Sequence, residues 1–167
     1  EVTHNLCGGT LPSRAKLAEL HSLCAERHIP LHTDGARVFN AAAAWGVSVG
    51  SITQHCDSVM FCLSKGLGAP VGSLLCGPHG FIEEAVAVRK RFGGGMRQAG
   101  ILAAGGLHAL DHHVTRLPED HANAQRLAAG LAEIKGLSLD PSRFPTNILF
   151  VETEPDAAPA WEKRLRE

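Results

Sequence analysis

Apolar residues recur along this chain in short runs that glycine, proline and charged residues separate. Helical spacing is clear at Leu17, Leu20 and Cys24, which lie three and four positions apart and would form one stripe on a helix. Compact apolar runs rich in valine and phenylalanine are typical of strands. The first part of the chain predicts, in order, a helix over residues 12–28, a buried strand over 29–33, a helix over 38–45, and strands over 58–63 and 73–76.

Helices dominate the rest of the pattern. The predicted elements are helices over 81–92, 98–112 and 119–135, a strand over 146–151 and the start of a helix at residue 156. The order strand, helix, strand in the first part is the βαβ pattern of α/β sheets. We therefore expect a three-layer α/β domain over residues 1–136 and the beginning of a small α+β domain over 137–167.

The amino-acid composition argues against some classes of binding partner. Sixteen Lys and Arg against 17 Asp and Glu give a net charge of −1, which argues against nucleic acid or an anionic membrane as a partner. The apolar runs are far shorter than the ~20 residues of a membrane span. Five cysteines without a C-x-x-C pair indicate reduced, buried thiols and a cytoplasmic location. A mitochondrial location stays open, because the chain does not begin with Met and its true start is expected before Glu1.

The segment His-Thr-Asp-Gly-Ala-Arg, residues 32–37, places an acidic residue at the end of the first predicted strand. Ligands of open α/β sheets bind outside the C-terminal ends of the strands. Asp34 falls at that edge, where a buried carboxylate needs a cationic partner. Arg37 is one possible partner, and the pair would then be structural. The segment alone leaves a turn aspartate and a ligand-binding aspartate equally open.

A lysine follows the second predicted strand and precedes a loop rich in glycine, residues 65–72. An amine among apolar groups can form a Schiff base with a carbonyl, whereas a strand-end lysine that reaches water is structural. If the two strands are parallel neighbours, Asp34 and Lys65 emerge at the same edge of the sheet. One can then keep a pyridinium nitrogen protonated while the other holds an aldehyde carbon, as a pyridoxal phosphate site requires.

Other motifs are weaker. Gly66, Gly68 and Gly72 imitate a dinucleotide fingerprint, but the third glycine is one residue late and Pro70 blocks a helix directly after the turn. His108 and His112 are spaced as zinc ligands on a helix, but the glutamate of the H-E-x-x-H motif is absent, so we expect no metal site. The chain also lacks a G-x-S-x-G nucleophile elbow.

Three long segments carry a specific resemblance: HTDGAR at 32–37, DSVMFCLSKGLGAPVGS at 57–73 and GGGMRQAGILAAGG at 93–106. With EVTHN at the start, LPEDHANA at 117–124 and TNILFV at 146–151, they cover nearly the whole chain. The chain resembles threonine aldolases, which are fold type I enzymes that depend on pyridoxal phosphate. The resemblance implies cleavage of threonine or allo-threonine to glycine and acetaldehyde by a homo-oligomer, a dimer or a tetramer.

By this resemblance Lys65 forms the Schiff base with the cofactor, Asp34 pairs with the pyridine nitrogen and Ser64 lies beside the cofactor. Arg37 binds the substrate carboxylate. The resemblance further implies that Arg97 lies near the cofactor phosphate and that Lys90 lies near the substrate, both across a subunit interface.

The chain also departs from the family. Val2 stands where the family has asparagine, and the tyrosine that follows the family's Leu-Pro pair is missing. The family's phosphate-binding loop, its cofactor-stacking histidine and a second carboxylate-binding arginine have no counterpart, and no residue is assigned as the base for the β-hydroxyl. The resemblance thus predicts the central part of such an enzyme. A transaminase, a β-eliminating lyase, or a truncated product that keeps only fold and subunit contacts are the alternatives.

Overall fold

The computed structural model describes residues 1–166, which form two compact units. The first unit comprises residues 1–3 and 11–118, and the second comprises residues 4–10 with the residues from 119 onward. The predicted domain boundary at residue 137 lies within the second unit. As a division of the protein into domains, it stays a prediction.

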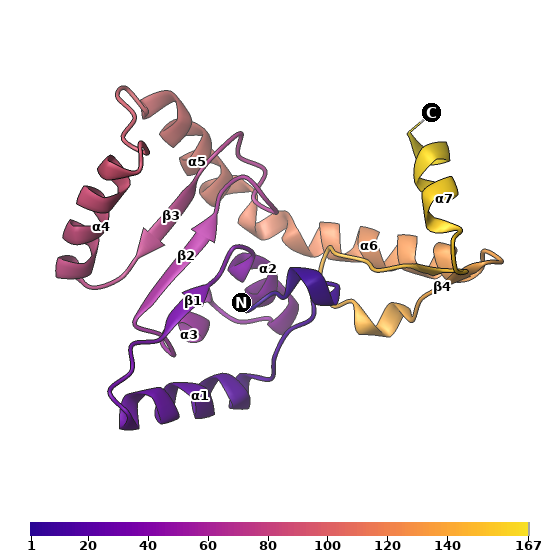
Figure 1. Cartoon of the computed structure of the whole chain (residues 1–167), viewed down its shortest axis with the longest axis horizontal. Coiled ribbons are helices and arrows are strands. Elements are labelled where there is room, and N and C mark those ends of the chain that lie inside the picture. The colour runs from indigo at the N-terminus through magenta and orange to yellow at the C-terminus, as the bar shows by residue number, and fades with distance from the viewer. Residues whose placement is uncertain (167) are drawn as a thin grey trace. The chain divides into compact units, whose positions relative to one another are not determined.

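The sheet of the first unit has three strands in the order β1-β2-β3 (Figure 1). β1 (His32–Asp34) pairs in parallel with β2 (Ser58–Cys62), and β2 pairs in antiparallel with β3 (Ser73–Cys76). The register sets Asp34 opposite Met60. The βαβ pattern and the pairing of the third apolar run beside the second are both confirmed.

Some helices of the first unit begin where the sequence supplies a cap or a proline. Ser13 accepts a hydrogen bond from the backbone of Lys16 at the start of the first helix, and Pro78 directly precedes the fourth. The helices are α1 (Arg14–Glu26), α2 (Val38–Trp45), α3 (Val49–Thr53), α4 (His79–Arg91) and α5 (Gly100–His112). The short α3, which the apolar pattern did not predict, has its own cap at Ser48.

Two apolar clusters hold this unit together, and α2 contributes to both. One cluster is built on Val38 and Ala41 of α2 with Ile52 of α3. The other joins Leu67, in the loop after β2, to Ala109 of α5 and to Leu117. The loop that carries Lys65 is therefore packed onto α5 instead of hanging free.

The second unit brings together segments that are far apart in the sequence. Its elements are η1 (Asn5–Cys7), α6 (Leu117–Ala132), β4 (Leu137–Ser138), η3 (Pro141–Arg143), β5 (Glu152–Thr153) and α7 (Ala158–Leu165). The first two residues of α6 belong to the first unit. β4 pairs in antiparallel with β5. The hydroxyl of Thr146, which is fully buried, donates to the carbonyl of Gly9 over 3.0 Å. A Cβ on Gly8 would lie 2.6 Å from the ring of Phe144, so glycine is needed there for this close packing.

Two strand predictions were wrong. The predicted strand over 146–151 is irregular, and the strand of that region is β5, at 152–153. The apolar run finds no ladder partner among residues 1–166, whereas β5 pairs with β4. The first strand begins at His32 instead of Ile29 and is not buried, since His32 and Asp34 are exposed. Pro30 has no N–H to donate to a ladder, which favours the later start.

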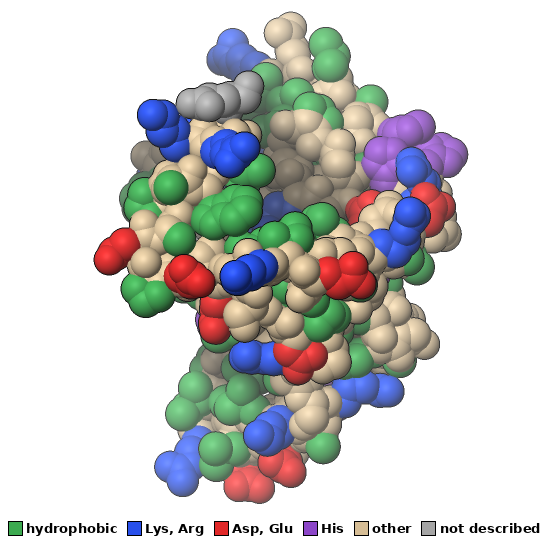
Figure 2. Space-filling view, turned by 90° about the vertical axis from the view of Figure 1, so that its right-hand side faces the viewer, with side chains coloured by type: hydrophobic (Ala, Val, Ile, Leu, Met, Phe, Trp, Pro, Cys, Tyr) green, Lys and Arg blue, Asp and Glu red, His purple; other side chains and the backbone are tan. Residues whose placement is uncertain are grey.

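The prediction that the cysteines are buried was wrong. All five thiols are free, but Cys7 and Cys76 are exposed and the other three are only half-buried. Within residues 1–166, none of the helices combines the length and apolarity that a membrane crossing needs. On the face drawn in Figure 2, acidic and basic side chains are mixed among hydrophobic ones, in line with the net charge of −1.

Candidate active site

The C-terminal ends of β1 and β2 lie at the same edge of the sheet because the two strands are parallel. Asp34 is the last residue of β1, and Lys65 follows the end of β2 by three residues. The backbone N–H of Gly35 donates to the carbonyl of Met60 over 2.9 Å and so holds the turn after β1 against β2. The structure thus brings an acid and a lysine to the edge where α/β sheets bind ligands.

The carboxylate of Asp34 is fixed by the turn that follows it. Its Oδ1 accepts the backbone N–H of Ala36 over 2.9 Å, while the backbone carbonyl of Asp34 accepts the N–H of Val2 over 3.1 Å. No ion pair joins Asp34 to Arg37 in the described chain, so the structural pairing considered from the sequence does not form. The carboxylate is exposed and can accept a further hydrogen bond from a ligand.

Lys65 projects from a closed loop. The N–H of Gly68 donates to the carbonyl of Lys65, and the N–H of Ala69 donates to the carbonyl of Leu63, each over 2.9 Å. Leu67, only 2% exposed, anchors the loop in the apolar core, whereas the lysine side chain itself is exposed. The expected apolar surroundings of the amine are therefore absent from the described residues, because the core takes up Leu67 and leaves Lys65 at the rim.

Gly66, next to the lysine, is in close contact with a buried polar side chain. A Cβ on Gly66 would lie 2.5 Å from Oδ1 and 3.2 Å from Nδ2 of Asn40. Asn40 is 1% exposed and belongs to α2. The amide of Asn40 thus packs directly against the lysine loop, and only glycine at position 66 leaves room for this amide.

Replacing Gly66 by alanine should lower the free energy of unfolding by about 1–3 kcal/mol, because the added methyl overpacks a buried site. Urea unfolding of the two chains measures the difference. The matched control is Gly80→Ala in α4, where a Cβ meets nothing within 4 Å and the extra methyl should be neutral or slightly stabilising. Equal stability of the Gly66 variant and the parent would contradict the close contact.

Arg37 stands at the start of α2 and is held by the N-terminal segment. The hydroxyl of Thr3 donates to the carbonyl of Arg37 over 2.9 Å, and the N–H of Ala41 donates to the same carbonyl over 3.2 Å. Thr3 is 1% exposed. Val2 and Thr3 therefore tie down both ends of the turn that runs from Asp34 to Arg37.

Substitution of Thr3 by valine keeps the shape of the side chain but removes its donor. Because Ala41 still bonds the carbonyl, we expect a loss of about 1 kcal/mol in the free energy of unfolding. Serine keeps the hydroxyl and should retain the bond, which makes Thr3→Ser the control. Thermal unfolding of the three chains compares them, and a valine variant as stable as the parent would argue against the bond.

The remaining predicted residues are placed less closely. Ser64 is exposed beside Lys65 in the same loop. Lys90 lies in the last turn of α4, and Arg97 lies in the connection between α4 and α5; both are exposed. No described contact joins Lys90 or Arg97 to Asp34 or Lys65, so their assignment to one site stays a prediction.

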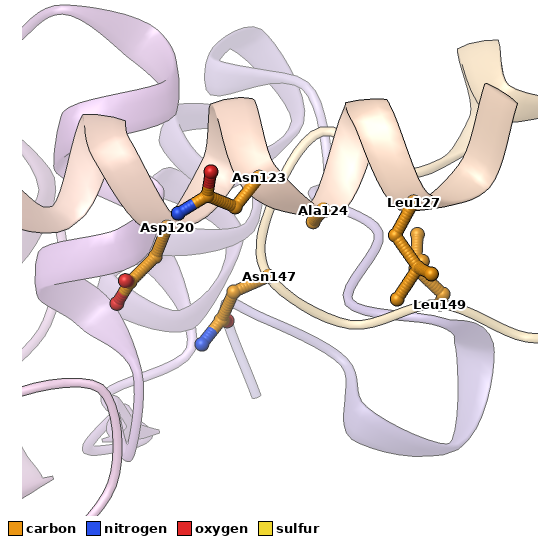
Figure 3. A pocket seen from close by; sticks show the side chains of 6 residues that line it. All are labelled: Asp120, Asn123, Ala124, Leu127, Asn147 and Leu149. Carbon is orange, nitrogen blue, oxygen red and sulfur yellow. The ribbon is translucent and has the colours of Figure 1, made fainter. Parts of the chain in front are cut away.

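A separate pocket of about 420 Å³ lies in the second unit and has different chemistry. Asp120 and Asn123 of α6 and Asn147 supply its polar groups, and Leu127 faces Leu149 at its apolar end (Figure 3). None of the residues predicted for the site lines this pocket. None of its lining residues is a cation or comes from the sheet edge, so we assign it no part in the chemistry of that edge.

Sequence reasoning missed the residues that support the site. Asn40 had a signal, since it is the one polar residue in the apolar run from Val38 to Trp45. Thr3 acts across 34 residues of sequence, and His113, whose ring bonds the carbonyl of Leu67, acts across 46. Contacts of that range leave no periodic pattern in the sequence.

Comparison with known proteins agrees with this fold. The family model described as beta-eliminating lyase matches residues 1–154. A crystal structure from Exiguobacterium sp. 255-15, assigned provisionally to aromatic amino acid beta-eliminating lyases or threonine aldolases, superposes with a TM-score of 0.87 at 25% identity, over 94% of this chain and 44% of that one. The chain belongs to the beta-eliminating lyase family, and the predicted α/β fold class is confirmed.

The relatives by sequence carry a narrower description. The chain is 51% identical to the low specificity L-threonine aldolase of Escherichia coli K12 and 43% identical to low-specificity L-threonine aldolase 1 of Arabidopsis thaliana, each over 166 residues. These matches cover 99% of this chain but 48% and 46% of the relatives. The resemblance to threonine aldolases is confirmed, and the chain spans about half the length of the relatives that it matches.

Proposed function

We propose that this chain is the lysine-bearing part of a pyridoxal phosphate dependent aldehyde-lyase that cleaves L-threonine or L-allo-threonine to glycine and an aldehyde. The observation that carries the proposal is the common sheet edge of Asp34 and Lys65, which follow two parallel strands. The identity of 51% with the Escherichia coli aldolase supports the substrate class.

The side chains at this edge fit the cofactor. Both the amine of Lys65 and the carboxylate of Asp34 are exposed, so a ligand would have access to each, and the carboxylate keeps acceptor capacity beyond its bond to Ala36. Lys65 would hold the cofactor covalently through its amine, and Asp34 would keep the ring nitrogen protonated. Ser64 would lie beside the cofactor, and Arg97 would pair with its phosphate.

Two cationic side chains, Arg37 and Lys90, would bind the substrate. The guanidinium of Arg37 would bind the substrate carboxylate through two parallel hydrogen bonds, and Lys90 would add positive charge near it. When bound, pyridoxal phosphate supplies a ring that accepts the electron pair of the breaking Cα–Cβ bond. The protein's part is to fix the Cα–Cβ bond in position while the β-hydroxyl loses its proton and Cα gains one.

The test is to mix the purified chain with pyridoxal phosphate, record the visible absorbance, reduce with borohydride and map the labelled peptide. We expect one label, on Lys65, and release of glycine and acetaldehyde from threonine. A folded chain that takes no label on Lys65 would refute the proposal and favour a truncated product that keeps only the fold.

A second candidate is β-elimination, which the family description and the Exiguobacterium structure favour. A β-eliminating lyase, like a transaminase, would release a keto acid in place of glycine. Product analysis on threonine and serine separates the two, because only the aldolase reaction yields glycine.

We further propose that the full-length protein is a cytoplasmic homo-oligomer, a dimer or a tetramer. Five free thiols support a reducing compartment. Phe92, Met96 and Ile101, around the connection of α4 and α5, are 88%, 65% and 86% exposed, which is typical of a contact with a second copy. Sedimentation equilibrium should show association that Phe92→Ser weakens; a monomer at all concentrations would contradict the proposal.

A further inference from the structure

The loop that carries Lys65 is bonded to α5 by a histidine that the proposed chemistry does not use. Nδ1 of His113 lies 2.6 Å from the carbonyl oxygen of Leu67, two residues after Lys65. A carbonyl oxygen only accepts hydrogen bonds, so Nδ1 must carry the proton and donate it. The contact thereby assigns a proton to Nδ1 of His113.

Both the backbone and the ring of His113 make contacts with neighbouring groups. The backbone N–H of His113 donates to the carbonyl of Ala109 over 2.9 Å, and the N–H of Arg116 donates to the carbonyl of His113 over 3.0 Å. On one side the ring packs edge-on against His108, with the ring centroids 5.3 Å apart. On the other side a Cβ on Gly68 would lie 3.5 Å from Nδ1, so the ring lies directly against the loop.

The bond from His113 holds the backbone of the lysine loop at Leu67. Leu67 is buried in the cluster with Ala109 and Leu117, which fixes its side chain but not the orientation of its peptide group. The peptide that joins Leu67 to Gly68 is held at both of its polar groups: its carbonyl accepts from His113, and its N–H donates to the carbonyl of Lys65. Because the N–H of this peptide is bonded to the carbonyl of Lys65, a shift of the peptide would also disturb the backbone of the lysine.

We propose that His113 is a positioning residue for Lys65: its Nδ1–H holds the carbonyl of Leu67 and so keeps the lysine aimed at the cofactor. This role rests on the proposed function, because only a lysine that bonds the cofactor needs to be held in one position. A misplacement of about 1 Å at a reacting group lowers rates by on the order of 10²-fold. A second contact that holds the loop should therefore have a large effect on the rate at which Lys65 reacts.

Two variants separate the hydrogen bond from the space that the ring fills. His113→Leu removes the donor, whereas His113→Asn keeps an N–H close to the position of Nδ1. Amide hydrogen exchange at Gly68 and Ala69 reports on the loop without any cofactor. We expect exchange about fivefold to tenfold faster in the leucine variant and close to that of the parent in the asparagine variant.

Nitrogen NMR of the imidazole ring tests the assignment in the parent chain directly, and needs no variant to fold. A proton on Nδ1 is the expected result. A ring protonated only on Nε2, or loop exchange that is the same in the parent and the leucine variant, would overturn the proposal.

The role in positioning is measured by the rate at which borohydride traps pyridoxal phosphate on Lys65. We expect about a tenfold slower rate in His113→Leu and recovery in His113→Asn. Equal rates in the parent and the leucine variant would refute the positioning role. A parent chain that takes no label at all would refute the proposed function instead, while NMR and exchange would still decide whether His113 holds the loop.

Discussion

Replacing Lys65 by alanine should abolish cofactor trapping and lower threonine cleavage by on the order of 10³-fold or more, because the amine is the only group proposed to hold the cofactor covalently. Borohydride reduction followed by peptide mapping measures the first effect, and a glycine assay the second. The side chain of Lys65 is exposed and its loop is held by the backbone and by Leu67, so the variant should fold as the parent does.

The matched control for this variant is Lys135→Ala, which removes another exposed lysine, in the second unit. It should keep full trapping and full activity. Trapping that persists in Lys65→Ala and moves to other lysines would show that labelling follows exposure alone, and the sheet edge would then lose its assigned chemistry.

Replacing Asp34 by asparagine should lower the rate of cleavage by about 10²-fold, since it removes a charge aimed at the developing transition state while keeping the size of the side chain. The amide oxygen can still accept the N–H of Ala36, so the turn after β1 should persist. Steady-state kinetics measures the rate, and urea unfolding should show a free energy close to that of the parent.

Asp57→Asn is the control for the charge. The carboxylate of Asp57 accepts the N–H of Leu31 over 2.7 Å, so it also bonds a backbone group, but it lies at the opposite end of β2. Activity should be unchanged in this variant. If both substitutions lowered the rate equally, the loss would reflect stability and not the charge at the sheet edge.

The parts of the fold that the sequence predicted well are those that local pattern decides. The limits of α2 and β3 agree with the predictions residue for residue, because α2 is an apolar helix closed by Gly46 and β3 pairs with β2, the strand directly before it in the sequence. The strand over 146–151 failed for the opposite reason. A strand exists only where another segment offers its N–H and carbonyl groups, and that information lies elsewhere in the chain.

The candidate site was predictable to a similar extent. Asp34 and Lys65 could be brought together from the sequence because one assumption, a parallel pair of strands, is enough to place both at one edge. Their exposure could not be predicted, since it depends on the packing of Leu67 and Asn40 against other elements. Supports such as Thr3 and His113 bond to backbone carbonyls, which every residue possesses, so no side chain of matching chemistry marks them in the sequence.

The second unit begins with residues 4–10 and is completed by a bond between Gly9 and Thr146, which are 137 residues apart. On the ribosome, residues up to 118 can form the first unit while the Gly8–Gly9 loop still has nothing to pack against. Since the two ends of so long a loop must meet before their contacts can form, the second unit should form after the first, and slowly. The time between the two events is when the nascent chain is most open to proteases and to chaperones.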